Sequence, residues 1–127
     1  MKWVKYRTQA LLHFLQTPPA SELNSSEWIV FLKVALDQGC TVKDVMQETN
    51  LSQQSVSRIV RNLSLTVTPG GRNGRHLLKT EQEGRFFTLW LDRGGADLFA
   101  ALCTLHRTID DQIAAACRAE MEGLCRN

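Results

Sequence analysis

Residues 41–63, TVKDVMQETNLSQQSVSRIVRNL, predict two short helices joined by a tight turn. Thr41 can cap the first helix, with Asp44 three residues later returning a bond to the chain in a variant of the capping box. Asn50 suits the left-handed conformation that ends a helix, and Ser52 can cap the second helix. Both helices have an apolar stripe, formed by Val42, Val45 and Met46 in the first and by Val56, Ile59, Val60 and Leu63 in the second.

The second helix has two chemically different faces. Opposite its apolar stripe lie Gln54, Ser57, Arg58 and Arg61, with Gln53 and Ser55 beside them near the amino end. No acidic residue occurs between Gln53 and Leu63. Glutamine, serine and arginine can hydrogen-bond to base edges and phosphates, so the pattern predicts a recognition helix over residues 53–63 for a DNA major groove. An ordinary helical hairpin with a solvated face is the alternative.

Positive charge is concentrated on this part of the chain. The formal net charge is +2, but residues 52–85 hold six basic residues against two acidic ones, whereas the remainder holds nine basic and eleven acidic residues. The basic residues are Arg58, Arg61, Arg72, Arg75, Lys79 and Arg85. This distribution is what phosphate binding requires.

Length and composition favour a single soluble domain over residues 1–127. No apolar run is long enough to span a membrane, and the start, MKWVKYRTQALLHFL, is interrupted by Lys5 and Arg7 and does not read as a secretory signal. We therefore expect a cytoplasmic protein. Cys40, Cys103, Cys117 and Cys125 form no metal-binding pattern, so free thiols are expected and no cofactor or metal is predicted. A redox-sensing role, with Cys40 as the first candidate, stays open.

Two helices are expected before the helix pair of residues 41–63. Residues 3–16 form the first, which Pro18 and Pro19 end. A second helix over about 27–38 is capped by Ser25 or Ser26 and ended by Gly39. Its expected core stripe is Trp28, Phe31, Leu32, Ala35 and Leu36.

A β-hairpin is expected after the recognition helix. Strands are drawn over 75–80 and 85–91, joined by the turn EQEG, residues 81–84. In the second strand Phe87, Leu89 and Leu91 alternate with Thr88 and Trp90, which predicts that the first three face a core. A hairpin in this position is a wing, and its basic residues can reach phosphates or the minor groove.

The last helix is expected over about residues 95–123. Leu98, Leu102, Leu105, Ile109, Ile113 and Ala116 recur along it at spacings of four and three. Such a stripe is longer than a small helical core can cover, which favours a partner chain. The helix over 3–16 can instead fold back over it, and both arrangements can coexist in an intertwined dimer. The expected dimer interface is Leu11, Phe14, Leu98, Leu102, Leu105, Ile109 and Ile113.

With these elements in order, the chain resembles the winged-helix regulators of the MarR type. LSQQSVSRIVRNL resembles the recognition helix of that family, and FTLWLDRGGADLF resembles its wing strand, turn and the start of its dimerising helix. The resemblance implies a mainly α fold with a small hairpin, comprising a winged helix-turn-helix core over 25–93 and dimerisation helices over 1–17 and 95–125. It places Gln53, Gln54, Ser55, Ser57, Arg58 and Arg61 in the major groove, and Lys79 and Arg85 at or near the wing.

The chain departs from the family pattern around the wing. TVTPGGRNGRH inserts a glycine-rich basic stretch, and EQEG carries two acids where family members commonly have basic residues. The expected basic contact therefore moves toward Arg72 and Arg75. The full expected DNA-contacting set is Ser52, Gln53, Gln54, Ser55, Ser57, Arg58, Arg61, Arg72, Arg75, Lys79 and Arg85.

The function predicted from the sequence is a homodimeric, sequence-specific DNA-binding transcriptional regulator, most simply a repressor that reads a palindrome. Its expected partners are double-stranded DNA and a second copy of itself; an inducer is possible but not indicated. One alternative is a plasmid or phage replication, partition or recombination accessory protein. Another is a winged-helix protein-interaction module, which would replace the basic face with an apolar patch. An enzyme is least expected, since no catalytic constellation can be placed on converging elements.

Overall fold

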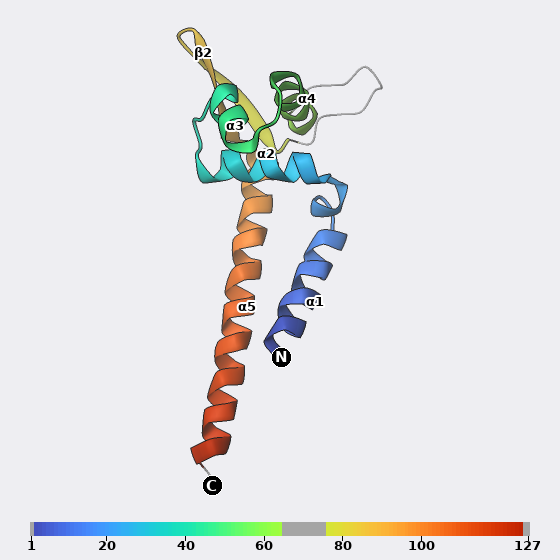
Figure 1. The fold of residues 1–127 in the computed structure, drawn as a ribbon, viewed down its shortest axis with the longest axis vertical. Helices are drawn as coiled ribbons and strands as arrows, with labels where there is room; N and C mark the ends of the chain where they lie inside the picture. Colours follow the sequence, from blue (N-terminus) through green and yellow to red (C-terminus); the bar gives the residue numbers. More distant parts are fainter. Residues whose placement is uncertain (1, 65–75, 126–127) are drawn as a thin grey trace. The chain divides into compact units, whose positions relative to one another are not determined.

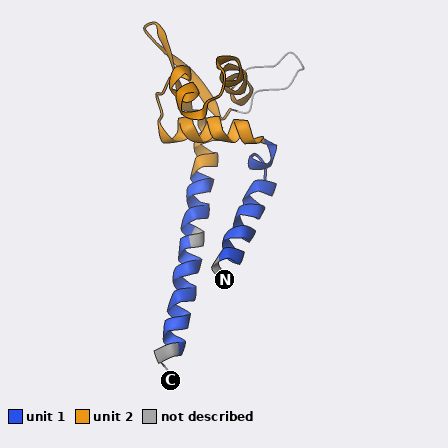
Figure 2. Ribbon diagram, viewed as in Figure 1, with its two compact units in different colours: residues 1–22, 100–127 blue, residues 23–99 orange. Residues whose placement is uncertain are grey.

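The computed structural model describes residues 2–64 and 76–125. Its elements follow the order α1 (Lys2–Gln16), the 3-10 helix η1 (Ala20–Glu22), α2 (Ser25–Leu36), α3 (Val42–Thr49), α4 (Gln53–Leu63), β1 (Leu78–Glu83), β2 (Phe86–Leu91) and α5 (Arg93–Cys125) (Figure 1). The predicted fold class, mainly helical with one antiparallel hairpin, is confirmed. The chain divides into one unit of residues 23–99 and another of residues 1–22 and 100–127 (Figure 2).

Helix α2 begins with a capping box that the sequence prediction misplaced. The cap is Asn24, not Ser25 or Ser26: its side chain accepts from the Glu27 N–H at 2.8 Å, and the Glu27 carboxylate accepts from the Asn24 N–H at 3.1 Å. This reciprocal pair satisfies two backbone donors that a single serine cap would leave partly unmet. Ser25 and Ser26 therefore lie inside the first turn.

The buried face of α2 also differs from the predicted stripe. The fully buried positions are Glu27, Val30, Phe31 and Val34. Of the predicted stripe, Phe31 is buried, and Trp28, Leu32 and Ala35 are half-buried. Leu36, expected in the core, is 80% exposed. The helix is apolar around most of its circumference, so the spacing of its apolar residues does not determine which face is buried. Contacts with α3, α4 and β2 determine the buried face.

The helix-turn-helix forms as the local sequence predicts. Thr41 and Asp44 make a capping box, with the Thr41 hydroxyl accepting at 3.3 Å and the Asp44 carboxylate accepting at 3.0 Å. Asn50 ends α3 in the left-handed conformation, at φ +59°. Ser52 caps α4, whose buried residues are Val56, Ile59, Val60 and Leu63, as predicted.

The first strand of the hairpin is shifted three residues toward the turn, and the turn is tighter than predicted. Glu83 pairs with Phe86, so EQE belongs to β1 and the turn is Gly84–Arg85. Gly84 has φ +62°, the positive angle that a two-residue hairpin turn needs. Leu89 is buried as predicted, but Phe87 is 58% exposed. The prediction for Phe87 was wrong because the hairpin continues past the helices that bury its base (Figure 1).

One backbone segment ties the hairpin to both neighbouring helices. The Leu77 N–H donates to the Leu63 carbonyl at 2.8 Å, and the Leu77 carbonyl accepts from the Asp92 N–H at 3.0 Å. Gly95 in α5 passes so close to this carbonyl that a side-chain carbon there would stand 1.9 Å from the oxygen. Glycine is therefore required at this crossing, whatever its helix propensity.

A further pair of backbone bonds fixes β2 to the loop after α2. The Gly39 N–H donates to the Leu89 carbonyl at 2.8 Å, and the Leu89 N–H donates to the Cys40 carbonyl at 2.7 Å. The base of the hairpin thus becomes part of the core of residues 23–99.

The long stripe of α5 is only half covered within the chain. Leu102, Leu105, Ile113 and Ala116 are half-buried, whereas Leu98 is buried at 3% exposure. Leu98 therefore already packs within one chain. On α1, Leu11 is exposed and Phe14 is half-buried. No helix in the described part of the chain has the length and apolar character that crossing a membrane requires.

Candidate nucleic-acid interface

The outward face of α4 gathers the polar residues singled out by the sequence. Gln53, Gln54, Ser57, Arg58 and Arg61 are all exposed, while Val56 and Leu63 on the opposite side are fully buried. The helix is therefore held by its apolar side and presents amides, a hydroxyl and two guanidinium groups to solvent. In the described part of the chain, neither arginine has a carboxylate partner.

Two serines from the expected DNA-contacting set are engaged in capping. The Ser52 oxygen accepts from the Ser55 N–H at 3.1 Å, and its hydroxyl donates to the Ser55 hydroxyl oxygen at 2.9 Å. Ser52 is exposed and Ser55 is half-buried. Their first role is to begin α4 at the correct residue, which sets the phase of its outward face.

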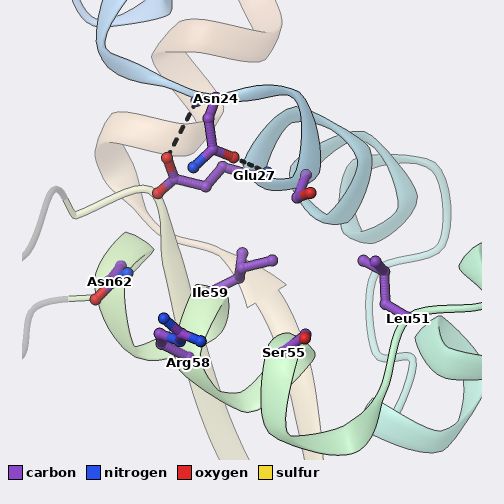
Figure 3. Close-up of a pocket in the computed structure, with 8 residues that line it drawn as sticks. Asn24, Glu27, Leu51, Ser55, Arg58, Ile59 and Asn62 are labelled. Carbon is purple, nitrogen blue, oxygen red and sulfur yellow. Dashed lines mark hydrogen bonds between the residues drawn. The ribbon is translucent and has the colours of Figure 1, made fainter.

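Ser55 and Arg58 also line a groove between α4 and the amino end of α2 (Figure 3). Its volume is about 230 Å³, and its lining residues are Asn24, Ser26, Glu27, Leu51, Ser55, Arg58, Ile59 and Asn62. The Asn24–Glu27 capping box forms one wall, so a carboxylate that is only 6% exposed lies in the lining. The groove thus offers hydrogen-bonding groups along one flank of the helix.

Asn62 is the α4 residue that sequence reasoning missed. It follows Ser55 and Arg58 at helical spacing, and it lines the same groove. That spacing was visible in the sequence. The sequence pattern did not show that the amino end of α2 lies beside this side of α4. The cap of α2 had been assigned to Ser25 or Ser26 and not to Asn24, which lines the groove.

The wing carries less free positive charge than its composition suggests. Lys79 lies on β1 and its ammonium is 3.5 Å from the Glu81 carboxylate. Arg85 lies in the two-residue turn at the tip and is exposed. Arg72 and Arg75, predicted to carry the wing's basic contact, lie outside the described residues.

An ion-pair cluster joins α2 to α3, and α3 in turn contacts α4. The Lys33 ammonium lies 2.8 Å from the Glu48 carboxylate and 3.6 Å from that of Asp37. The hydrogen bond to Glu48, with the nearby negative charges, raises the pKa of Lys33 above its usual value. Lys33 therefore stays charged and links the two helices.

Cys40 is a poor candidate for a reactive thiol. It is 3% exposed in the bridge to Leu89. Burial, reinforced by the Asp37 carboxylate, raises the pKa of its thiol. A thiolate is the reactive form, so this environment disfavours redox sensing. Cys103 is exposed on α5.

No family model matches the sequence, and no curated protein matches it. Solved structures do. A MarR-like transcriptional regulator from Thermotoga maritima is similar with a TM-score of 0.66 at 17% identity, over 97% of this chain and 89% of that one. A Staphylococcus aureus MepR variant bound to an oligodeoxyribonucleotide is similar with a TM-score of 0.66 at 14% identity, over 95% and 85%.

A third similar structure is Bordetella bronchiseptica BpsR, whose DNA binding is regulated by 6-hydroxynicotinic acid. Its TM-score is 0.54 at 21% identity, over 96% of this chain and 87% of that one. At identities this low, the similarity shows a shared fold. The chain has the winged helix-turn-helix fold of the MarR-type transcriptional regulators.

Proposed function

We propose that the protein is a homodimeric, sequence-specific DNA-binding transcriptional regulator, most simply a repressor that reads a palindromic operator. The observation that carries this proposal is the outward face of α4. It combines Gln54, Ser57, Arg58 and Arg61 without an acidic residue, on a helix whose opposite side is buried. Gln54 pairs with adenine edges and an arginine with guanine edges, while Ser57 takes a phosphate or a base.

The fold likeness supports the same proposal from a second direction. One similar structure is a regulator bound to an oligodeoxyribonucleotide, and others are transcriptional regulators. In this chain, the cap and ion-pair contacts fix α4 through α3 and α2, as a rigid reader requires. Such a protein acts where genomic DNA lies, in the cytoplasm.

The dimer part of the proposal rests on apolar surface that one chain leaves uncovered. On α1, Leu11 and Leu12 are exposed, and on α5 the stripe through Leu102, Leu105 and Ile113 is only half-buried. Together with Phe14 and Ile109, whose side chain lies outside the described ones, these residues make the proposed interface. Leu98 is excluded, because it is already buried within one chain. A two-fold dimer carries two copies of α4 and therefore reads two related half-sites.

Selection from random-sequence duplex DNA tests the proposal. The purified protein is taken through repeated rounds of binding at two salt concentrations, and the recovered duplexes are sequenced. Recovery of a palindrome with half-sites about one helical turn apart supports a dimeric major-groove reader. Binding without sequence preference contradicts the regulator proposal and favours an accessory role in replication or partition. No binding at low salt rejects the DNA proposal altogether.

Sedimentation tests the dimer separately. Leu105→Asp places a carboxylate on the half-buried stripe of α5, so we expect the wild type to sediment as a dimer and the variant as a monomer. Asp111→Ala, on an exposed position of the same helix, is the matched control and should leave the dimer intact. A wild-type monomer at concentrations that saturate DNA would contradict the dimer proposal.

A further inference from the structure

The base of the hairpin is bonded to both ends of the helix pair α3–α4. Before the pair, Leu89 of β2 accepts from the Gly39 N–H at 2.8 Å and donates to the Cys40 carbonyl at 2.7 Å. At the end of the pair, the Leu63 carbonyl accepts from the N–H of Leu77, the residue before β1, at 2.8 Å. One hairpin therefore fixes the chain where the helix pair begins and where it ends.

Trp90 adds a side-chain contact at the first of these ends. Its six-membered ring lies over Gly39, where a side-chain carbon would stand 3.2 Å from the nearest ring atom. Gly39 has φ +92°, an angle that residues other than glycine rarely adopt. Trp90 is half-buried, whereas Phe86, on the same face of β2 and nearer the turn, is 68% exposed. The ring therefore closes the loop between α2 and α3 against β2.

Hydrogen bonds hold the Trp90 side chain in this orientation. The indole N–H donates to the Thr88 hydroxyl oxygen at 2.8 Å, and that hydroxyl donates to the Glu81 carbonyl of β1 at 3.2 Å. Thr88 is only 6% exposed, so its hydroxyl is largely shielded from water. In the same loop, the Gln38 side-chain oxygen accepts from the Leu91 N–H at 3.2 Å. The loop before α3 is therefore held on β2 by both backbone and side-chain contacts.

This contact reaches α4 through α3. Cys40 directly precedes Thr41, whose side chain caps α3, and α3 packs against α4. Helix α3 is also held on α2 by the ion pair between Lys33 and Glu48 at 2.8 Å, which does not involve the hairpin. Loss of the Trp90 ring should thus loosen the orientation of the helix pair without unfolding it.

We propose that Trp90 is a positioning residue for sequence-specific binding, and that it acts through α4 without contacting DNA. This inference rests on the proposed function, in which the outward face of α4 reads base edges. Contacts of that kind need the helix to be held within about 0.5 Å and about 10–20° of its productive geometry. Attraction to phosphates tolerates larger displacements, because it acts over a Debye length of about 8–10 Å. Loosening one end of the helix pair should therefore weaken specific binding more than non-specific binding.

Affinities for the selected duplex and for a scrambled duplex of equal length test the inference. We expect Trp90→Ala to lower the ratio of the two affinities roughly tenfold, as losing one good base contact would. The affinity for the scrambled duplex should hardly change. Trp90→Phe keeps a ring over Gly39 and should restore most of the ratio. Phe86→Ala, which removes an exposed ring from the same face of β2, is the matched control and should leave the ratio unchanged.

Two further variants test the contact itself. Gln38→Ala removes the side-chain acceptor of the Leu91 N–H from an exposed position, so we expect a smaller fall in the ratio and little change in melting temperature. Gly39→Ala drives a carbon against the indole ring. It should therefore lower the melting temperature more in the wild type than in Trp90→Ala, which lacks that ring. All affinities are measured well below the lowest melting temperature in the set.

Three results would overturn the inference. A wild-type ratio in Trp90→Ala, with a lower melting temperature, would make the contact structural only. Equal falls in affinity for both duplexes would make Trp90 part of a non-specific DNA contact. Additive effects of Gly39→Ala and Trp90→Ala on melting temperature would show that the two residues do not interact. If Trp90→Ala does not fold, Trp90→Phe and Gln38→Ala decide in its place, and wild-type ratios in both reject the inference. A wild type that prefers no duplex would instead reject the proposed function itself.

Discussion

Helix α4 and the wing hairpin differ in how their charged side chains are distributed. Helix α4 carries two exposed arginines and no acid, on a face opposite its buried side. The hairpin carries Lys79 and Arg85 against Glu81 and Glu83, and all the charges of its strands lie on one face. Both belong to residues 23–99, so the same domain holds an acid-free helix face and a hairpin of mixed charge.

The number of basic residues alone would not separate these two regions. An arginine face gains affinity from phosphates and guanine edges, and that gain falls steeply with salt. On the hairpin, Lys79 is already paired with Glu81 at 3.5 Å, so less of its charge is free for phosphates. The two regions should therefore respond differently to the same experiments.

The largest effect is expected at the point where both regions are anchored. Gly95→Ala forces a carbon to within 1.9 Å of the Leu77 carbonyl oxygen, in the segment that links α4, the hairpin and α5. We expect a loss of about 3 kcal/mol or more in the free energy of unfolding, measured by chemical denaturation. Gly123→Ala, in the same helix with no atom within 4 Å, is the control and should be neutral or slightly stabilising. Equal stabilities would show that the crossing is not tight.

The next largest effect concerns the arginines of α4. Arg61→Ala and Arg58→Ala should each weaken binding to the selected duplex by about 1–3 kcal/mol where the guanidinium pairs with a base. An arginine that contacts a phosphate should instead lower the salt slope by about 1. Titrations at several salt concentrations distinguish the two roles. If Arg58→Ala left both affinity and specificity unchanged, its assignment to the reader would be wrong.

A smaller effect is expected from the acid that caps α3. The backbone N–H and hydroxyl of Thr41 lower the pKa of Asp44. Because the pKa of Asp44 is lowered on folding, its ionised carboxylate stabilises the fold at any pH above 3.8, the usual pKa of an aspartate. This contribution is lost as the pH falls through the lower pKa that Asp44 has in the folded protein. The difference in melting temperature between wild type and Asp44→Ala should thus be constant near neutrality and shrink below about pH 4. A difference that grew toward acid pH would contradict this role.

The smallest effect is expected at Lys79. Its ammonium is already paired with Glu81 at 3.5 Å, so Lys79→Ala should change DNA affinity much less than Arg61→Ala does. Exposed ion pairs of this kind contribute only about 0–1 kcal/mol, so stability should hardly change either. A loss as large as that of Arg61→Ala would mean that the wing binds phosphates directly and would remove the contrast between the two regions.

The part of the fold set by local interactions could be predicted from the sequence. The caps at Thr41 and Ser52, the left-handed Asn50 and the buried stripe of α4 depend on residues a few positions apart. The predicted turn EQEG failed because strand ends depend on register, and the pairing of Glu83 with Phe86 is set jointly by both strands. The exposure of Phe87 followed from where the helices end, which no strand pattern contains.

Faces that depend on distant neighbours were predicted less well. Helix α2 is apolar on most sides, so its buried stripe through Val30 and Val34 was decided by α3, α4 and β2. The groove that Asn62 shares with Asn24 and Glu27 joins residues far apart in the chain. The outward residues of α4 needed only the phase of one helix, and for that reason they were the strongest part of the site prediction.

The central claim is that the outward face of α4 carries sequence specificity and that the wing does not. Its most direct test is the ratio of affinities for the selected duplex and a scrambled duplex of equal length, measured for wild type, Gln54→Ala, Arg61→Ala and Lys79→Ala. We predict that Gln54→Ala and Arg61→Ala lower this ratio, whereas Lys79→Ala leaves the ratio nearly unchanged. A ratio that survives both α4 substitutions and collapses in Lys79→Ala would contradict the claim.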